Sequence, residues 1–281
     1  MKPSARRRSR IGYIMRSIIG WLISVTFLLP LFWMVSSSLK HNVDVFAIPI
    51  KWIPDPARWQ NYVGVWFGDG GSMARYFANS GFVSVLGVIG DLATASMAGY
   101  AFALLTFTGR DKIFLLYLAS AIIPQQLVMI PRFMFFQQIG LYDTLWALIL
   151  PGMFTVFGTF LFRQYFVALP DDYGNAARLD GASEWSVFFK IYLPMAKPVI
   201  ATLSIVSFVG SWNDYEGPLI MLISPQLYTV PLGLTRFVDA DGGLSAGLAM
   251  AGSVSSLIPI LLVFLLFQRQ FVAALVRSGI D

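Results

Sequence analysis

Four charged residues interrupt the apolar stretches of this 281-residue chain, and they are the first candidates for function: Asp91, Arg132, Asp214 and Glu216. A charge deep in apolar surroundings is costly unless it faces a cavity or a partner. Asp214 also belongs to the cluster Trp212-Asn213-Asp214-Tyr215. Aromatic faces and hydrogen-bonding side chains together suit a neutral polyol. This cluster, with Asp91, is therefore predicted to line a path for a polar solute.

The same residues have a structural interpretation. Asn213 and Asp214 can cap a helix break at Gly217-Pro218, or they can pair with another subunit. Asp91 can serve as a hydrogen-bond partner between helices. At the level of sequence both interpretations stay open.

Composition excludes several classes of site. The chain has no Cys and a single His, His41, which rules out disulfide scaffolds, thiolate nucleophiles and Cys-rich zinc sites. Only 12% of the residues are charged, against roughly 25% in soluble domains, and the mean hydropathy is +0.68. The net charge of +5 is too modest to indicate a nucleic-acid partner. No G-x-x-x-x-G-K-[ST] loop is present, so the chain lacks that kind of ATP site.

Six apolar stretches predict an all-α integral membrane protein, because a helix needs about 20 mostly apolar residues to cross a bilayer. They are Ser17–Ser38, Asn79–Leu105, Ile113–Phe135, Asp143–Ala168, Ala196–Ile223 and Leu248–Val276. The predicted organisation is a basic N-terminal tail (1–16), a transmembrane domain (17–276) and a short C-terminal tail (277–281). With the N-terminus inside, most Lys and Arg fall on the cytoplasmic side, which predicts that both termini are cytoplasmic and that the basic tail touches anionic lipid.

The cytoplasmic segment 169–194 differs from an ordinary loop. Its first half is typical of a short helix that Gly181 would stop, since a helix end commonly needs a residue with positive φ. Ser183 can cap a second short helix, which carries aromatic residues at spacings of three and four before Pro194 ends it. We call this segment the elbow. Its apolar surface either lies against the bilayer or the bundle, or enters a groove of another protein.

The elbow carries a resemblance. The run Asn175-Ala-Ala-Arg-Leu-Asp-Gly-Ala-Ser183, followed by an aromatic-rich stretch and Leu193-Pro194, resembles the EAA loop of the transmembrane subunits of ATP-binding-cassette importers. Nearly the whole chain is similar to sugar-importer permeases related to the smaller maltose permease subunit. Supporting segments include Ser37-Ser38-Leu39-Lys40, Ala98–Ala103, Leu148–Pro151, Trp212–Tyr215 and Gln268–Val272. The resemblance implies the type I importer permease fold with six transmembrane helices, in a bacterial inner membrane.

This resemblance also implies a set of partners. Two permeases, usually as a heterodimer, form the pathway, and two ATP-binding-cassette ATPase subunits dock below. An extracytoplasmic solute-binding protein delivers the sugar. ATP and Mg are expected on the ATPase subunits, whereas this chain is expected to bind no cofactor, to contact membrane lipid and to be a transporter subunit rather than an enzyme.

Residue roles follow from the same resemblance. In the family the elbow is the coupling helix, which sits in a cleft of the ATPase. The matching ATPase-coupling residues are Asn175, Ala176, Ala177, Asp180, Gly181, Ala182, Ser183, Trp185, Phe188, Leu193 and Pro194. The leading Glu of the family motif is Asn175 here, which removes a carboxylate. The long outer segment Ser224–Gly247 is expected to reach the binding protein, with contacts from Arg236, Asp239 and Asp241.

Two other classes of protein fit the sequence less well. An intramembrane hydrolase needs a His, an Asp pair or a Ser dyad within the bundle, but the single His, His41, lies at the outer edge. A gradient-driven transporter could use Asp91, Arg132 and Asp214 as a charge relay, although it would have no need of a docking elbow. Within the importer class, a sugar, an amino sugar, a polyol and glycerol-3-phosphate all remain possible cargoes.

Overall fold

The chain folds into helices and connecting segments throughout the part that the structure describes. The computed structural model describes residues 4–68, 73–170, 172–237 and 245–278. In the two terminal helices, it describes side chains only for residues 15–38, 246–266 and 268. The main elements are α1 (Ser4–Ser38), α2 (Asn42–Val45), α3 (Gln60–Phe67), α4 (Met73–Leu104), α5 (Arg110–Ser120), α6 (Gln125–Gln138), α7 (Trp146–Gly152), α8 (Val156–Val167), α9 (Asp172–Leu179), α10 (Glu184–Val187), the π-helical turn η1 (Phe188–Tyr192), α11 (Leu193–Met195), α12 (Lys197–Trp212), α13 (Glu216–Met221), η2 (Pro225–Leu227), α14 (Val230–Leu234), η3 (Thr235–Phe237) and α15 (Ala246–Ser278). The predicted all-α class is confirmed.

Among the described residues, four helices are long and apolar enough to cross a membrane: Met15–Ser38, Met73–Leu104, Trp146–Val167 and Ala246–Leu266. Two further pairs of helices pass the same test only together. These pairs are α5 with α6, bent by 94°, and Glu184–Met195 with α12, bent by 75°. If each bent pair counts as one span, the total reaches six. The predicted count of six spans therefore stays a prediction.

The helix breaks fall where proline or a polar cap interrupts the chain. The stretch Ile113–Phe135, predicted as one span, is divided at Ala121–Pro124. Pro124 has an extended ψ of 133° and precedes α6, and it lacks the N–H that a continuous helix would need there. The stretch Ala196–Ile223 is also divided, because α12 ends at Trp212 and α13 begins at Glu216.

The chain forms two compact units. Unit 1 is Met1–Ser72 with Leu234–Ser255, and unit 2 is Met73–Gly233 with Ser256–Asp281. In unit 1, the Asn61 side-chain amide donates to the backbone oxygens of Ser38 and Lys40 at 2.9 and 2.8 Å. Asn42 accepts from the backbone N–H of Gly247 at 3.0 Å. Asn61 thus joins α3 to the end of α1, and Asn42 joins α2 to the start of α15.

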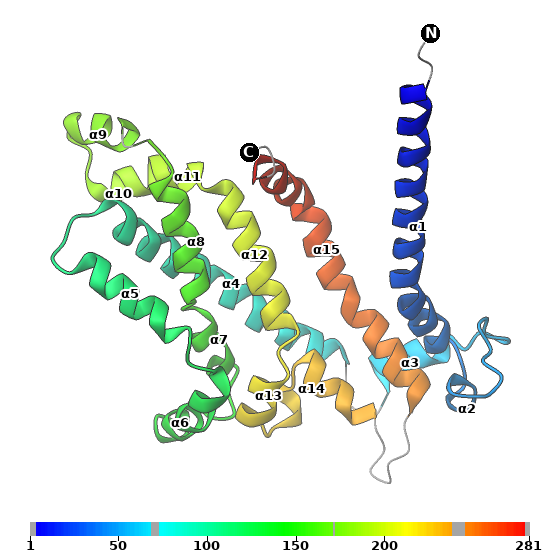
Figure 1. Cartoon of the computed structure of the whole chain (residues 1–281). Helices are drawn as coiled ribbons and strands as arrows, with labels where there is room; N and C mark the ends of the chain where they lie inside the picture. The colour runs from blue at the N-terminus through cyan, green and yellow to red at the C-terminus, as the bar shows by residue number, and fades with distance from the viewer. Residues whose placement is uncertain (1–3, 69–72, 171, 238–244, 279–281) are drawn as a thin grey trace. The chain divides into compact units, whose positions relative to one another are not determined.

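Helix α4 is the central element of unit 2 and packs most extensively against α8 and α12. Their shared core includes Ala95, Phe162 and Leu203, one from each helix. The elbow lies at the same end of unit 2 as the turn between α4 and α5, whereas α6 and α13 lie at the opposite end (Figure 1). Unit 2 thus holds the elbow and the predicted path residues.

Close contact between α4 and α8 depends on a glycine. A Cβ at Gly99 would lie 2.5 Å from the Phe162 Cβ and 2.9 Å from the Arg163 backbone nitrogen. Small residues let membrane helices approach each other in this way. The seam between α4 and α8 is therefore closely packed near the elbow.

Candidate functional site

The elbow has the local structure predicted from its sequence. Helix α9 ends at Leu179, and Gly181 follows with φ +82°. Ser183 is the N-cap of α10, and its hydroxyl accepts from the backbone N–H of Ser186 at 3.3 Å. Two short helices joined by a left-handed glycine are thus confirmed.

Pro194 does not end the second helix, contrary to the prediction. The helix runs on from Glu184 to Met195, with the π-helical turn η1 at Phe188–Tyr192 directly before Leu193 and Pro194. Proline removes one backbone donor, so the α-helical bonding pattern cannot hold there. The wider π-helical turn accommodates the missing hydrogen bond. The bend to α12 follows two residues after Pro194, at Ala196.

The elbow presents one apolar face to its surroundings and buries another. Leu179 is 89% exposed and Trp185 is 63% exposed, and the Trp185 ring stacks on the exposed ring of Phe189 at 5.9 Å. Phe188 and Tyr192 are buried in the core of unit 2. Exposed aromatic and aliphatic groups next to a firmly packed face are typical of a docking surface.

The predicted coupling residues divide between these faces. Six of them are exposed: Asn175, Ala176, Asp180, Gly181, Ser183 and Pro194. Trp185 joins this exposed group. Three others are partly buried and pack against the core: Ala177, Ala182 and Leu193. Phe188 is buried against the ring of Tyr100, at 5.2 Å between centroids, so it supports the elbow from beneath.

Arg178 forms a cluster that the sequence analysis did not single out. Its Nε and Nη2 donate to the two carboxylate oxygens of Glu184, at 2.6 and 3.2 Å. The hydroxyl of Tyr100 donates to the same carboxylate at 2.6 Å. We call Tyr100, Arg178 and Glu184 the clasp. The hydrogen bond to Glu184 raises the pKa of Arg178 above its ordinary value, so the guanidinium stays charged.

Asn175, which replaces the Glu of the family motif, touches this cluster. Its side-chain oxygen accepts from Nη1 of Arg178 at 3.3 Å. A neutral amide therefore stands beside the guanidinium, while the carboxylate comes from Glu184 in the next helix.

A cavity of about 850 Å³ lies in unit 2 and is lined by residues of α4 to α8, α12 and α13, most of them apolar. Its charged lining residues are Arg132, Asp214 and Glu216. The Nε of Arg132 is buried without a hydrogen-bond partner among the described residues. A cavity with charged groups and an unpartnered donor can accommodate a polar solute.

The predicted path residues are not all brought to this cavity. Asp214 lines it, and its carboxylate also accepts from the backbone N–H of Gly217 at 3.1 Å, as expected of a cap for the broken helix. Trp212 is buried, and its indole N–H donates to the backbone oxygen of Ser256 at 3.1 Å. Asn213 donates to the backbone oxygen of Val209 within its own helix, and Tyr215 is 40% exposed.

Other residues line the cavity that the sequence analysis did not assign to the path. Phe154 and Phe157 supply aromatic surface, and Gln125, Ser207 and Ser211 supply hydrogen-bonding groups. Nothing in the local sequence distinguishes these side chains from ordinary residues of a span. Among the lining residues outside the predicted path, Arg132 and Glu216 did carry a signal, because each is a charge within an apolar stretch.

Asp91 is fully buried and joins three helices. Its carboxylate accepts from the hydroxyls of Thr155 and Ser207, at 2.6 and 2.5 Å. Thr155 is also the N-cap of α8. Asp91 itself is not among the cavity-lining residues, whereas both of its partners are. The arrangement is that of an interhelical hydrogen-bond partner.

At the opposite end of unit 2, Asp143 ties two turns together. Its carboxylate accepts from the backbone N–H groups of Ile223 and Ser224, each at 2.9 Å. Arg236 is exposed in η3 of unit 1. Asp239 and Asp241, the other two predicted contacts of the binding protein, lie outside the described residues.

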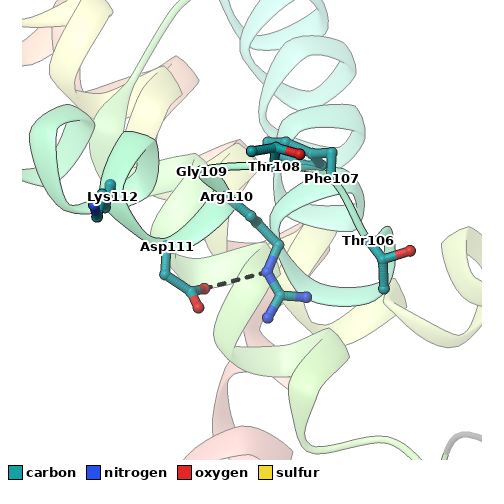
Figure 2. Close-up of a pocket in the computed structure, with 7 residues that line it drawn as sticks. All are labelled: Thr106, Phe107, Thr108, Gly109, Arg110, Asp111 and Lys112. Carbon is teal, nitrogen blue, oxygen red and sulfur yellow. Dashed lines mark hydrogen bonds and ion pairs between the residues drawn. The ribbon is translucent and has the colours of Figure 1, made fainter.

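A second pocket lies at the turn between α4 and α5. It measures about 510 Å³ and is lined by the consecutive residues Thr106–Lys112 (Figure 2). Arg110 donates to Asp111 at 3.2 Å in this turn. Because one short turn makes the whole pocket, we assign it no solute.

Comparison with known proteins agrees with these observations. The family described as "Binding-protein-dependent transport system inner membrane component" matches residues 5–277. The chain is 34% identical over 272 residues to the arabinooligosaccharides transport system permease protein AraQ of Halalkalibacterium halodurans, covering 94% of this chain and 97% of that protein. It is 31% identical to the diacetylchitobiose uptake system permease protein NgcG of Streptomyces coelicolor, covering 98% and 90%. It is also 31% identical to the sn-glycerol-3-phosphate transport system permease protein UgpE of Pectobacterium atrosepticum, covering 93% and 94%.

Solved structures share the fold. A chain of a bacterial ABC transporter involved in the import of the acidic polysaccharide alginate matches with a TM-score of 0.82 at 22% identity, covering 95% of this chain and 99% of that chain. A chain of a bacterial alginate ABC transporter in complex with an alginate pentasaccharide-bound periplasmic protein matches with a TM-score of 0.65 at 12% identity, covering 93% and 95%. The family match over nearly the whole length and relatives above 30% identity show that this chain belongs to the binding-protein-dependent transport system inner membrane components, as a permease of ATP-binding-cassette importers that crosses a bacterial inner membrane several times.

Proposed function

We propose that this chain is one of two transmembrane subunits of an ATP-driven, solute-binding-protein-dependent sugar importer. A different permease completes a heterodimer, and the two together form the translocation pathway. Two ATPase subunits dock on the elbow around Gly181. The relatives named for arabinooligosaccharides and diacetylchitobiose support a carbohydrate cargo.

The energy source belongs to the partners in this proposal. The chain has no G-x-x-x-x-G-K-[ST] motif, so ATP and Mg are bound by the ATPase subunits. The elbow and both termini then face the cytoplasm, in agreement with the placement of Lys and Arg along the sequence.

One observation carries the proposal: the elbow exposes apolar side chains beyond a rigid, glycine-hinged bend. Leu179, Trp185 and Phe189 are exposed, whereas the residues beneath them are packed in the core. An exposed aromatic surface of this kind can dock into a cleft of a soluble partner. Because the residues beneath it are packed in the core, a displacement of the docked surface can be transmitted to unit 2.

The cavity in unit 2, with its three charged lining residues, supports the proposed role in transport. Arg132, Asp214 and Glu216 face it together with Phe154 and Phe157. Sugar hydroxyls can bind the charged groups while the sugar ring packs on an aromatic face. On the outer side, Arg236, Asp239 and Asp241 remain the proposed contacts for the solute-binding protein.

Replacement of Gly181 by Val tests the docking role. The φ of +82° at Gly181 suits glycine and strains a β-branched residue. We expect Gly181→Val to abolish uptake and to reduce the ATPase recovered with the purified permease by at least about tenfold, since a displaced bend removes several docking contacts together. Membrane insertion is expected to be normal.

Gly140→Val is the matched control. Gly140 has φ +73°, and a Cβ there would meet nothing within 4 Å, as at Gly181. The local strain is therefore similar, but Gly140 lies in the turn after α6, at the end opposite the elbow. Equal recovery of ATPase from both variants would contradict docking at the elbow.

A further inference from the structure

The clasp connects α9 to the body of unit 2 through charged and hydroxyl groups. Within α9, only Gly174 is buried. Arg178 lies in the last turn of α9 and reaches Glu184 in α10 and Tyr100 in α4. Three elements that are separate in sequence thus meet at one guanidinium.

The donors and acceptors of the clasp are well matched. Both carboxylate oxygens of Glu184 accept from Arg178, and one of them also accepts from Tyr100. Nη2 of Arg178 donates to the Tyr100 hydroxyl as well, at 3.4 Å. A bidentate pair of this kind fixes direction as well as distance.

Tyr100 makes the clasp part of the bundle. Its ring is 5% exposed and packs against Phe166, Phe188 and Tyr192, with centroids 5.2 to 6.1 Å away. Only its hydroxyl reaches the elbow. A displacement of α9 is therefore passed to a side chain that is wedged in the core.

Helix α4 continues from Tyr100 to the wall of the cavity. Asp91 lies nine residues earlier in the same helix, about 14 Å away at 1.5 Å per residue. It is bonded to Thr155 and Ser207, which line the cavity. One unbroken helix thus joins the clasp to the cavity.

We propose that the clasp is the positioning element that transmits movement of the docked elbow through α4 to the cavity, with Glu184 supplying the carboxylate. This inference rests on the proposed function, because it requires an ATPase that moves the elbow. Asn175 then serves as a neutral neighbour of Arg178.

A purely stabilising role does not account for the cluster. The side chains of Arg178 and Glu184 are 31% and 46% exposed, and exposed ion pairs contribute little to stability. By contrast, a cluster whose hydrogen bonds join α9, α10 and α4 has the contacts that transmission of movement between these helices requires.

The test uses the complete transporter in proteoliposomes, with partner subunits free of Cys. Because this chain has no Cys, Ser211→Cys places a single thiol at the cavity wall. The probe is N-ethylmaleimide, and the measured quantity is the change in its reaction rate between the nucleotide-free and the vanadate-trapped transporter. No knowledge of the cargo is needed.

We expect Glu184→Gln and Tyr100→Phe to reduce this nucleotide-dependent change by at least about fivefold, since each removes a hydrogen bond of a charged cluster. The amount of ATPase recovered with the permease is expected to stay normal. Exchange of the charges, with Arg178→Glu and Glu184→Arg together, is expected to restore at least about half of the response.

Two control variants remove similar groups near the elbow without touching the clasp. Tyr165→Phe deletes a hydroxyl that donates to the backbone oxygen of Met195 at 2.8 Å. Asp111→Asn breaks the exposed pair with Arg110 in the neighbouring turn. Both are expected to keep the full response.

The outcomes separate the two proposals. An unchanged response in Glu184→Gln and Tyr100→Phe overturns the clasp as a transmission element. A loss of ATPase recovery in these variants overturns it too. So does a failure of the exchanged pair, Arg178→Glu with Glu184→Arg, to restore the response. A thiol that does not respond to vanadate trapping when the clasp is intact overturns the proposed function itself.

Discussion

Two carboxylates hold helix α4 at two levels, and their surroundings differ. Asp91 belongs to α4, is fully buried and accepts from the neutral hydroxyls of Thr155 and Ser207. Glu184 belongs to the elbow, is half-exposed and pairs with charged Arg178 and with Tyr100 of α4. Water can replace lost partners at Glu184 but cannot reach Asp91. The buried group therefore contributes to stability, whereas the exposed one is suited to transmit movement.

The largest expected effect on stability is at the buried carboxylate. The hydroxyl of Thr155 donates to Asp91 and, as the N-cap of α8, accepts from the Gly158 N–H at 3.0 Å. Thr155→Val removes both hydrogen bonds. We expect the free energy of unfolding to fall by about 2–4 kcal/mol, measured by thermal unfolding in detergent. Thr202→Val is the control, because its hydroxyl only donates to Pro198 within its own helix. Equal losses of unfolding free energy in both variants would show that the hydrogen bond to Asp91 stabilises the fold no more than a hydrogen bond within one helix.

A smaller effect is expected at the seam between the two carboxylates. Gly99→Ala places a Cβ 2.5 Å from the Phe162 Cβ, and overpacking of this kind costs about 1–3 kcal/mol. Gly81→Ala lies in the same helix, where a Cβ would meet nothing within 4 Å. There we expect a gain of up to about 1 kcal/mol from helix propensity. Melting curves of the two variants that shift in the same direction would contradict a close-packed seam.

The smallest expected effect on stability is at the clasp. Glu184→Gln is expected to change the free energy of unfolding by less than about 1 kcal/mol, because the pair is partly exposed. The same variant is expected to lose the nucleotide-dependent response described above. A loss of stability as large as that of Thr155→Val would make the two carboxylates equivalent and would break the comparison.

Much of the elbow could be predicted because its signals are local. Gly181 needs positive φ, and Ser183 caps the next helix through a residue three positions away. Neighbours within one helical turn are set by the chain itself. The continuation past Pro194 could not be predicted, since packing of Phe188 and Tyr192 in the core stabilises the helix across the proline.

The cavity could be predicted only in part, because its wall comes from several helices. Asp214 was a candidate for the path and lines it, whereas Trp212 from the same cluster is buried and bonded to Ser256. Phe154 and Phe157 supply the aromatic lining instead. The direction in which a side chain faces depends on where its helix bends and what it packs against, and no local pattern records either.

Apolar runs of spanning length, the capped and glycine-hinged elbow and the absence of an ATP loop are written in consecutive residues, since each depends on chain length, backbone conformation or composition. The hydrogen bonds of Tyr100 with Arg178 and Glu184, those of Thr155 and Ser207 with Asp91, and the grouping of charges around one cavity form only once helices that are distant in sequence pack together. Hydrogen bonds act over about 3 Å, so such partners are specified by the folded arrangement rather than by spacing along the chain.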